Sequence, residues 1–205
     1  MGGLLQNFRN TLIVSLLLAA LVIVGYAVHS PDGAGEIFWQ AVFRWAHVAF
    51  GILWIGLLYY FNFVQIRVMP TIPAELKPAV SKYIAPEALF WFRWAAVFTV
   101  VTGLVIAGIR GYLLEALSLG LAGGFDADQD TQAAFIGLGM WLALIMAINV
   151  WVFIWPNQRV ALGMVDAEAD AKAKAARTAM LFSRTNLLLS LPMLATMTMN
   201  QTIFG

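Results

Sequence analysis

The sequence predicts an all-α integral membrane protein, a helical bundle of about five transmembrane helices. Of its 205 residues, 61% are hydrophobic and only 11% are charged, and the mean hydropathy is +0.81. An ordinary soluble domain is about 45–50% apolar and about 25% charged. In water, most of this apolar surface would be exposed at a large cost in free energy. In lipid, helices satisfy the hydrogen bonds of their own backbone and can present apolar side chains to hydrocarbon. We therefore expect the lipid bilayer to surround the chain.

Five segments are long and apolar enough to cross a hydrocarbon core about 30 Å thick, which needs about 20 residues per helix. They are expected at about residues 11–28, 37–66, 88–109, 131–155 and 179–199, within one domain that covers 1–205. No small-residue cleavage site follows the first segment, so we interpret it as a retained helix. Pro192 predicts a kink in the last helix. The Ala-rich residues 165–177 are expected to form a helix along the membrane surface, and residues 111–121 either lie along this surface or re-enter the bilayer.

The loops predict the orientation, because Lys and Arg accumulate on the cytoplasmic side of short loops. With the N-terminus inside, the inner side receives Arg9, Arg67, Lys77, Lys82, Arg159, Lys172, Lys174 and Arg177, and the outer side receives Arg110. The outer side collects Asp32, Glu36, Glu115, Asp126, Asp128 and Asp130. We therefore predict a multi-pass protein of the bacterial inner membrane with a cytoplasmic N-terminus and a C-terminus on the opposite face.

Composition excludes several classes of function. The net charge is +1 and the basic residues are scattered, which argues against a nucleic-acid partner. There is no cysteine, so disulfides, thiolate metal sites and the covalent attachment of c-type haem are all excluded. Any haem in this protein must be held without a covalent bond.

His47 is the leading candidate for a cofactor ligand. It lies about ten residues into the second predicted helix, and Gly51 and Trp54 follow on the same helical face. An imidazole at this depth can ligate the iron of haem b or the metal of another tetrapyrrole, and a nearby glycine would let a flat macrocycle approach. The alternative is a histidine that forms a hydrogen bond between packed helices.

A second axial ligand has two possible sources. His29 is the other histidine of the chain and lies at the outer end of the first predicted helix. The methionines Met193, Met197 and Met199 on the last helix could supply a thioether instead. A row of methionines also serves commonly as packing material.

Three arginines lie inside predicted spans, namely Arg44, Arg93 and Arg184. A cation at the centre of a membrane helix costs about 2.5–3.5 kcal/mol on insertion scales, so each needs an explanation. The side chains either reach the headgroups or bind a carboxylate, such as a haem propionate, an acidic substrate or Glu87. We take Arg44 and Arg93 as candidate anchors, and we note that Phe92 to Ala95 repeats the order Phe-Arg-Trp-Ala of residues 43–46.

Small and amide residues are expected to bring helices together. Close helix approach is predicted at Gly51, Gly56, Gly103, Gly108, Gly137 and Gly139. Near the cytoplasmic helix ends, Asn62, Gln65, Asn149, Asn157 and Gln158 are expected to cap or bridge helices, or else to form a small polar pocket.

Several longer stretches, in order along the chain from Arg44 onward, carry a family resemblance. They are Arg44 to His47, Gly51 to Gly56, Tyr60 to Asn62, Pro86 to Trp94, Asn149 to Gln158 and Asn186 to Leu194. Together they resemble the membrane domain of the bacterial membrane-bound urate hydroxylase (urate oxidase N-terminal domain) family. The resemblance implies a helical membrane bundle that oxidises urate and passes electrons to the respiratory chain.

The chain differs from the family in its length and in the histidines of its last helix, and both differences affect the expected function. Full-length members resemble it but carry more helices and often a cytochrome c domain, so we expect a short form. The last helix reads Ser183 to Asn186 and Met199 to Gln201 where the family is expected to place histidines. Of the histidines expected to ligate haem or metal in the family, this chain would then keep only His47.

Two functions remain in view, and no catalytic residue is assigned in either. The first is a urate hydroxylase-like oxidoreductase, a membrane redox domain for electron transfer with a non-covalent haem b or other tetrapyrrole. The second is a non-enzymatic accessory transmembrane subunit of a larger respiratory or photosynthetic complex. A homo-oligomer or a larger membrane complex is expected in both. Transport would require polar groups at the midplane and broken helices, to which only Pro192 and the arginines point.

Overall fold

The computed structural model describes residues 2–31, 33–122 and 127–204, and within these ranges it is helical and contains no strand. Asp32 and Asp126, which the orientation argument used, lie outside the described residues. Five helices in the described ranges are long and apolar enough to cross a membrane. They are Phe8–His29, Glu36–Thr71, Lys77–Ile109, Asp128–Ala161 and Ala169–Phe204. The predicted all-α fold with about five membrane spans is confirmed.

Several spans consist of more than one helical element. The elements are α1 (Gly2–Leu5), α2 (Phe8–His29), α3 (Glu36–Tyr59), η1 (Tyr60–Gln65), α4 (Ile66–Val68), η2 (Met69–Thr71), α5 (Lys77–Ala79), η3 (Val80–Ile84), α6 (Ala85–Ile109), α7 (Leu113–Leu117), α8 (Ala127–Ile148), η4 (Asn149–Ile154), α9 (Trp155–Ala161) and α10 (Ala169–Phe204). The elements η1, η3 and η4 are π-helical turns, which occur often at functional sites. They continue the helices on either side, so each span remains one rod.

One expectation about helix ends was wrong, whereas the surface location of residues 111–121 stays a prediction. The surface helix expected over 165–177 is not separate, because α10 runs without a break from Ala169 to Phe204. Its first half is rich in alanine and contains no glycine or proline that would end a helix. Residues 111–121 contain α7, which packs against α8 through a 2.9 Å hydrogen bond from Trp141 Nε1 to the Leu117 carbonyl oxygen.

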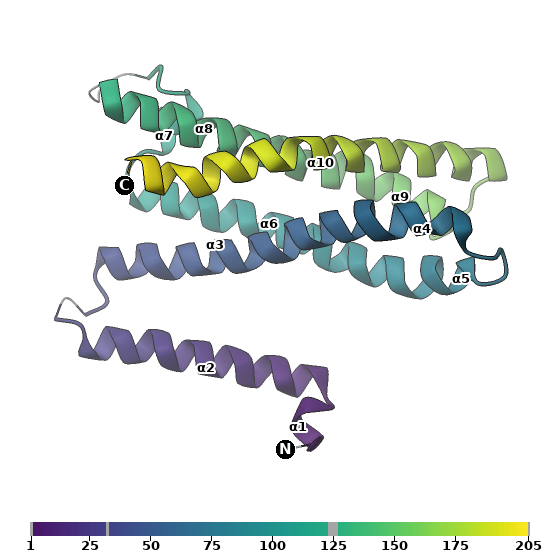
Figure 1. Cartoon of the computed structure of the whole chain (residues 1–205), viewed down its shortest axis with the longest axis horizontal. Helices are drawn as coiled ribbons and strands as arrows, with labels where there is room; N and C mark the ends of the chain where they lie inside the picture. Colours follow the sequence, from purple (N-terminus) through teal and green to yellow (C-terminus); the bar gives the residue numbers. More distant parts are fainter. Residues whose placement is uncertain (1, 32, 123–126, 205) are drawn as a thin grey trace.

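The bundle consists of two helical hairpins that lie against each other (Figure 1). One hairpin pairs α3 with α6, and the other pairs α8 and α9 with α10. The packed core lies in the half of the bundle that contains η1 and η4, and its fully buried large side chains include Trp54, Leu58, Leu89, Phe92 and Met146. The other half of the bundle holds a cavity.

The helix α2 lies apart from this bundle (Figure 1). None of its residues is buried. Its contact with α3 includes the stacked rings of Tyr26 and Phe38, whose centroids are 6.3 Å apart. Lipid or another protein must therefore cover nearly the whole of α2 in a membrane.

Amide side chains form hydrogen bonds between helices inside the packed half, and the bond of Asn62 joins the two hairpins. Asn62 donates to Ser183 Oγ at 2.9 Å, and Asn149 donates to Asn186 Oδ1 at 2.9 Å. Asn186 in turn donates to the Met146 carbonyl oxygen at 2.9 Å. Hydrogen bonds between membrane helices contribute about 0.6–2 kcal/mol each. The bridging role predicted for Asn62 and Asn149 is confirmed.

Close helix approach occurs at some of the predicted glycines. A Cβ atom at Gly137 would collide with the carbonyl oxygen of Ala116, and one at Gly139 would collide with Thr196 Oγ1. Gly103 lies against the ring of His47. The expectation was wrong at Gly56 and Gly108, where a Cβ would have nothing within 4 Å.

Replacing Gly137 with alanine is expected to lower the free energy of unfolding by about 1–3 kcal/mol, since overpacking of a filled site has this cost. The obstacle is the backbone of α7, which cannot rotate away as a side chain would. The fall in Tm in detergent would measure the effect. Gly108→Ala is the matched control, and equal Tm values for the two variants would contradict the close contact of α7 with α8.

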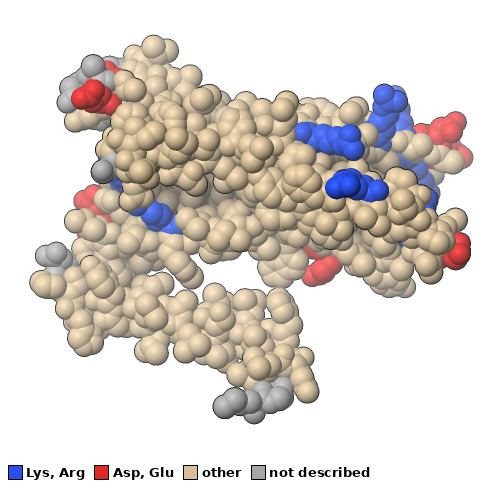
Figure 2. Space-filling model, in the orientation of Figure 1, with Lys and Arg blue, Asp and Glu red and all other residues tan. Residues whose placement is uncertain are grey.

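Charged side chains lie mainly toward the two ends of the bundle, and acidic groups are present at both ends (Figure 2). Lysines and arginines gather at the end formed by α4, α5, α9 and the beginning of α10. We call this the basic end. The C-terminus lies at the opposite end, whereas the N-terminus lies beside α1, below the middle of the bundle (Figure 1).

Candidate functional site

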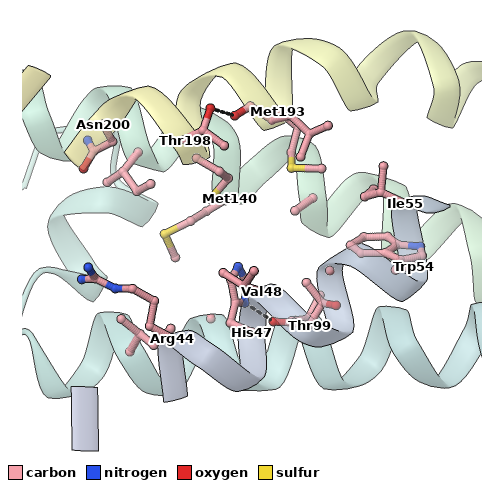
Figure 3. Close-up of a pocket in the computed structure, with 18 of the residues that line it drawn as sticks. Arg44, His47, Val48, Trp54, Ile55, Thr99, Met140, Met193, Thr198 and Asn200 are labelled. Carbon is pink, nitrogen blue, oxygen red and sulfur yellow. Dashed lines mark hydrogen bonds between the residues drawn. The ribbon is translucent and has the colours of Figure 1, made fainter. Parts of the chain in front are cut away.

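A cavity of about 640 Å³ lies between the two hairpins, in the half of the bundle away from the basic end. Its walls come from α3, α6, α8 and α10, and Figure 3 shows side chains from these helices around an open centre. The lining is mostly apolar, with polar groups that include Arg44, His47, Arg110, Asn200 and Gln201. Pockets of about 300–1,000 Å³ with few polar groups are typical of cofactor and small-molecule sites.

His47 enters this cavity from α3, and its ring is held by α6. The distance from His47 Nδ1 to the carbonyl oxygen of Thr99 is 2.8 Å. A carbonyl oxygen can only accept, so Nδ1 donates its proton and the neutral ring keeps a lone pair on Nε2. Metal-binding histidines are commonly oriented by this type of bond from the other ring nitrogen. The arrangement therefore prepares Nε2 as a ligand.

Gly103 on α6 makes room for the His47 ring. A Cβ built at Gly103 would lie 2.9 Å from His47 Cε1 and 3.1 Å from Nδ1. Both distances are shorter than ordinary contacts of a methyl group with a ring, so a side chain here would displace the imidazole. Gly103 supports the histidine from behind, a role that the sequence analysis assigned to no residue.

The other predicted residues of α3 also line the cavity. Arg44 lies one turn before His47, and its Nη1 donates to Gln201 Oε1 of α10 at 2.8 Å. Gly51 lies one turn after His47 and leaves the cavity wall flat there. Trp54 is fully buried where the cavity meets the packed core. The structure thus brings Arg44, His47, Gly51 and Trp54 together.

Two predicted residues lie elsewhere. His29 is at the end of α2, where its Nδ1 is 2.8 Å from the carbonyl oxygen of Gly25 in its own helix, and it does not line the cavity. Arg93 is in the packed half of the bundle, and its guanidinium carbon lies 3.2 Å from the centroid of the Trp155 ring. His29 therefore does not face His47, and Arg93 does not reach the cavity.

The methionines divide in the same way. Met193 and Met197 of α10 line the cavity, whereas Met199 does not and is 48% exposed. Met140 was not among the predicted residues, yet its thioether points from α8 into the cavity (Figure 3). Its position in an apolar helix next to Gly139 gave no signal beyond that of a packing residue.

The polar groups at the mouth of the cavity were not among the predicted site residues either. Arg110 and Tyr112 follow the end of α6 and line both the cavity and a smaller neighbouring pocket of about 250 Å³. Burial raises the pKa of the Tyr112 phenol, although the nearby Arg110 and Arg44 oppose this. Tyr112 therefore keeps its proton at neutral pH and can donate a hydrogen bond at the mouth.

The chemistry of the lining favours one type of ligand. The apolar walls suit a large apolar group, and Arg44 and Arg110 suit anionic substituents at its outer edge. The described residues contain no group of three or more His, Cys, Asp or Glu that could hold a bare metal ion. A tetrapyrrole supplies most of the ligands of its own metal, so His47 would need to add only one.

The fold and the cavity define a multi-pass helical membrane protein with an internal cavity. Residues 112–204 match the family model described as urate oxidase N-terminal, which confirms the predicted resemblance over this part of the chain. The match covers α7 to α10, the wall that carries Met140, Met193 and Met197, whereas His47 and Arg44 precede it. No curated protein and no solved structure matches the chain.

Proposed function

We propose that this chain is a membrane redox protein that binds haem b, or a closely related tetrapyrrole, in the cavity between its two hairpins. The observation that carries the proposal is the 2.8 Å hydrogen bond from His47 Nδ1 to the Thr99 carbonyl oxygen. This bond leaves Nε2 with a lone pair at the wall of an apolar cavity, so Nε2 would hold the iron of a bound haem. Haem held in this way would supply reversible transfer of single electrons.

The surrounding residues would bind and orient the macrocycle. Gly51 gives one wall of the cavity no side chain, so a flat ring can lie close to α3. Arg44 and Arg110 would pair with the propionates at the mouth, where Gln201 already fixes the Arg44 guanidinium. A thioether from Met140, Met193 or Met197 would complete the coordination from the α8 and α10 side, and a His/Met pair raises the reduction potential.

The family resemblance supports urate as the electron donor in this proposal. Electrons would then pass from urate to an acceptor in the respiratory chain, which makes the protein a urate hydroxylase-like oxidoreductase. We place it in the bacterial inner membrane with the basic end in the cytoplasm, since Lys and Arg mark the cytoplasmic side. This orientation puts the mouth of the cavity on the outer face.

A second candidate function rests on α2. A membrane helix without buried residues and with little contact to its own bundle is typical of a segment that packs on another protein. The chain could on this basis be an accessory transmembrane subunit of a larger respiratory or photosynthetic complex. The two functions are compatible, because the cavity does not involve α2.

An absorption spectrum of the protein purified in detergent tests the proposal. We expect Soret and α bands that sharpen on reduction, and stoichiometric haem b by the pyridine haemochromogen assay. Protein isolated without haem is expected to regain these bands when haemin is added. A colourless protein that does not take up haemin would overturn the haem proposal, and co-purification with stoichiometric partner chains would then favour the accessory subunit.

A further inference from the structure

Arg93 carries a buried charge that the proposed haem site does not use. It lies in the third membrane span, and only 8% of its surface is exposed. Its Nε and Nη1 atoms are covered and have no hydrogen-bond partner in the described part of the chain. Nearly all buried polar groups in proteins are hydrogen-bonded, so two unpartnered donors on one cation indicate a missing acceptor.

A tryptophan holds this guanidinium in place. The Arg93 guanidinium carbon is 3.2 Å from the centroid of the Trp155 ring and 5.7 Å from that of Trp151. A cation over an indole ring is attracted by the negative face of the ring. This interaction fixes the position of Arg93, but an aromatic face is no hydrogen-bond acceptor for the nitrogens in the guanidinium plane.

A second arginine shares the same indole. The guanidinium carbon of Arg159 is 5.9 Å from the Trp155 centroid, and its side chain is exposed. Neither Arg93 nor Arg159 forms an ion pair with a carboxylate among the described residues, and the exposed Glu87 instead accepts from Trp91 Nε1 at 3.0 Å. Two cations of like sign repel each other here unless an anion lies near both.

The surroundings indicate where this anion comes from. Trp151 is 36% exposed and Trp94 is 41% exposed, and their rings meet edge to face with centroids 5.7 Å apart on the lipid-facing surface of the bundle. Tryptophans of this kind lie at the level of the lipid headgroups. Arg159 belongs to α9, which forms part of the basic end (Figure 2).

We propose that Arg93, Arg159 and Trp155 form a binding site for a phosphate oxyanion, supplied by the headgroup of an anionic phospholipid in the leaflet at the basic end. The two guanidinium groups would donate hydrogen bonds to the phosphate oxygens, as arginine does in phosphate sites generally. The acyl chains would lie against Trp151 and Trp94. The site is separate from the cavity of His47, and this inference does not depend on bound haem.

The test measures the Tm of the purified protein by tryptophan fluorescence while phosphatidylglycerol is added to the detergent micelles. We expect the Tm to rise with phosphatidylglycerol, and to rise much less with net-neutral phosphatidylcholine. Arg93→Gln and Arg159→Gln are each expected to raise the half-saturating amount of phosphatidylglycerol about tenfold, because each variant loses one charge-assisted hydrogen bond to the phosphate. Native mass spectrometry should show the bound lipid in the wild type and its loss in the variants.

Arg184→Gln is the matched control, because it removes the same charge from an exposed position on α10 and should leave the half-saturating amount unchanged. Inorganic phosphate is the second probe. If it raises the Tm as phosphatidylglycerol does, the oxyanion site stands but its ligand comes from solution. Arg159→Gln alters an exposed residue, so it keeps the test decisive even where Arg93→Gln fails to fold. Wild-type lipid binding by both variants, or equal stabilisation by the two lipids, would overturn the proposal.

Discussion

His47→Ala is expected to abolish the Soret and α bands of the purified protein while leaving the helix content and the elution from size exclusion unchanged. The substitution removes the imidazole whose Nε2 faces the cavity, and no other histidine lines that cavity. Changes in groups that merely orient a ligand weaken metal binding about 10- to 100-fold, so the loss of the ligand itself should weaken haem binding at least as much. Haemin titration followed by absorbance would measure the change.

Rescue by imidazole separates ligation from a packing role. The space left by the side chain of His47 is open to the cavity, so added imidazole should enter it and restore the bands. A purely structural histidine would not be replaced in this way. His29→Ala is the matched control and should retain full haem content, because His29 bonds to its own helix and lies outside the cavity. Unchanged bands in His47→Ala would exclude His47 as the ligand.

Gly103→Ala is expected to weaken haem binding about 10- to 100-fold although it alters no ligand. The new methyl group would lie 2.9 Å from His47 Cε1, so the imidazole must turn or shift. Either movement lengthens the 2.8 Å bond from Nδ1 to the Thr99 carbonyl oxygen and moves Nε2 away from its present position. Haemin titration and the midpoint potential of the bound haem would both report this change.

The control for Gly103→Ala lies further along the same helix. Gly108→Ala adds the same methyl group to α6 in a place where nothing lies within 4 Å, and it should leave haem binding unchanged. Both variants should have a similar Tm, because the His47 side chain can rotate away from the new methyl group. If Gly103→Ala bound haem as tightly as Gly108→Ala, the support of His47 by α6 would not matter for binding.

Much of the site on α3 could be predicted from the sequence because it lies within one helix. Arg44, His47, Gly51 and Trp54 follow a helical repeat, so their shared face is a local property of the chain. Arg93 shows the limit of the same reasoning. Its Phe-Arg-Trp-Ala motif repeats that of Arg44, yet one arginine bonds to Gln201 at the cavity and the other stacks on Trp155.

The residues that complete the site come from helices distant in sequence. Thr99 and Gly103 fix the His47 ring from α6, and Met140 faces the cavity from α8. Nothing in the local pattern of an apolar membrane helix marks which of its faces meets another helix, since lipid accepts apolar side chains equally well. These contacts are decided when the hairpins pack.

The sequence by itself determined that the chain is helical and that five of its segments can cross a membrane. That outcome follows from hydropathy and segment length, which act residue by residue against hydrocarbon. The tertiary structure alone decided that the hairpins leave a cavity of about 640 Å³, that His47 faces it with Nε2, and that α2 stays outside the bundle. Packing between membrane helices depends on shape and hydrogen bonds rather than on apolar burial. The composition of the sequence therefore says little about which helices pack together.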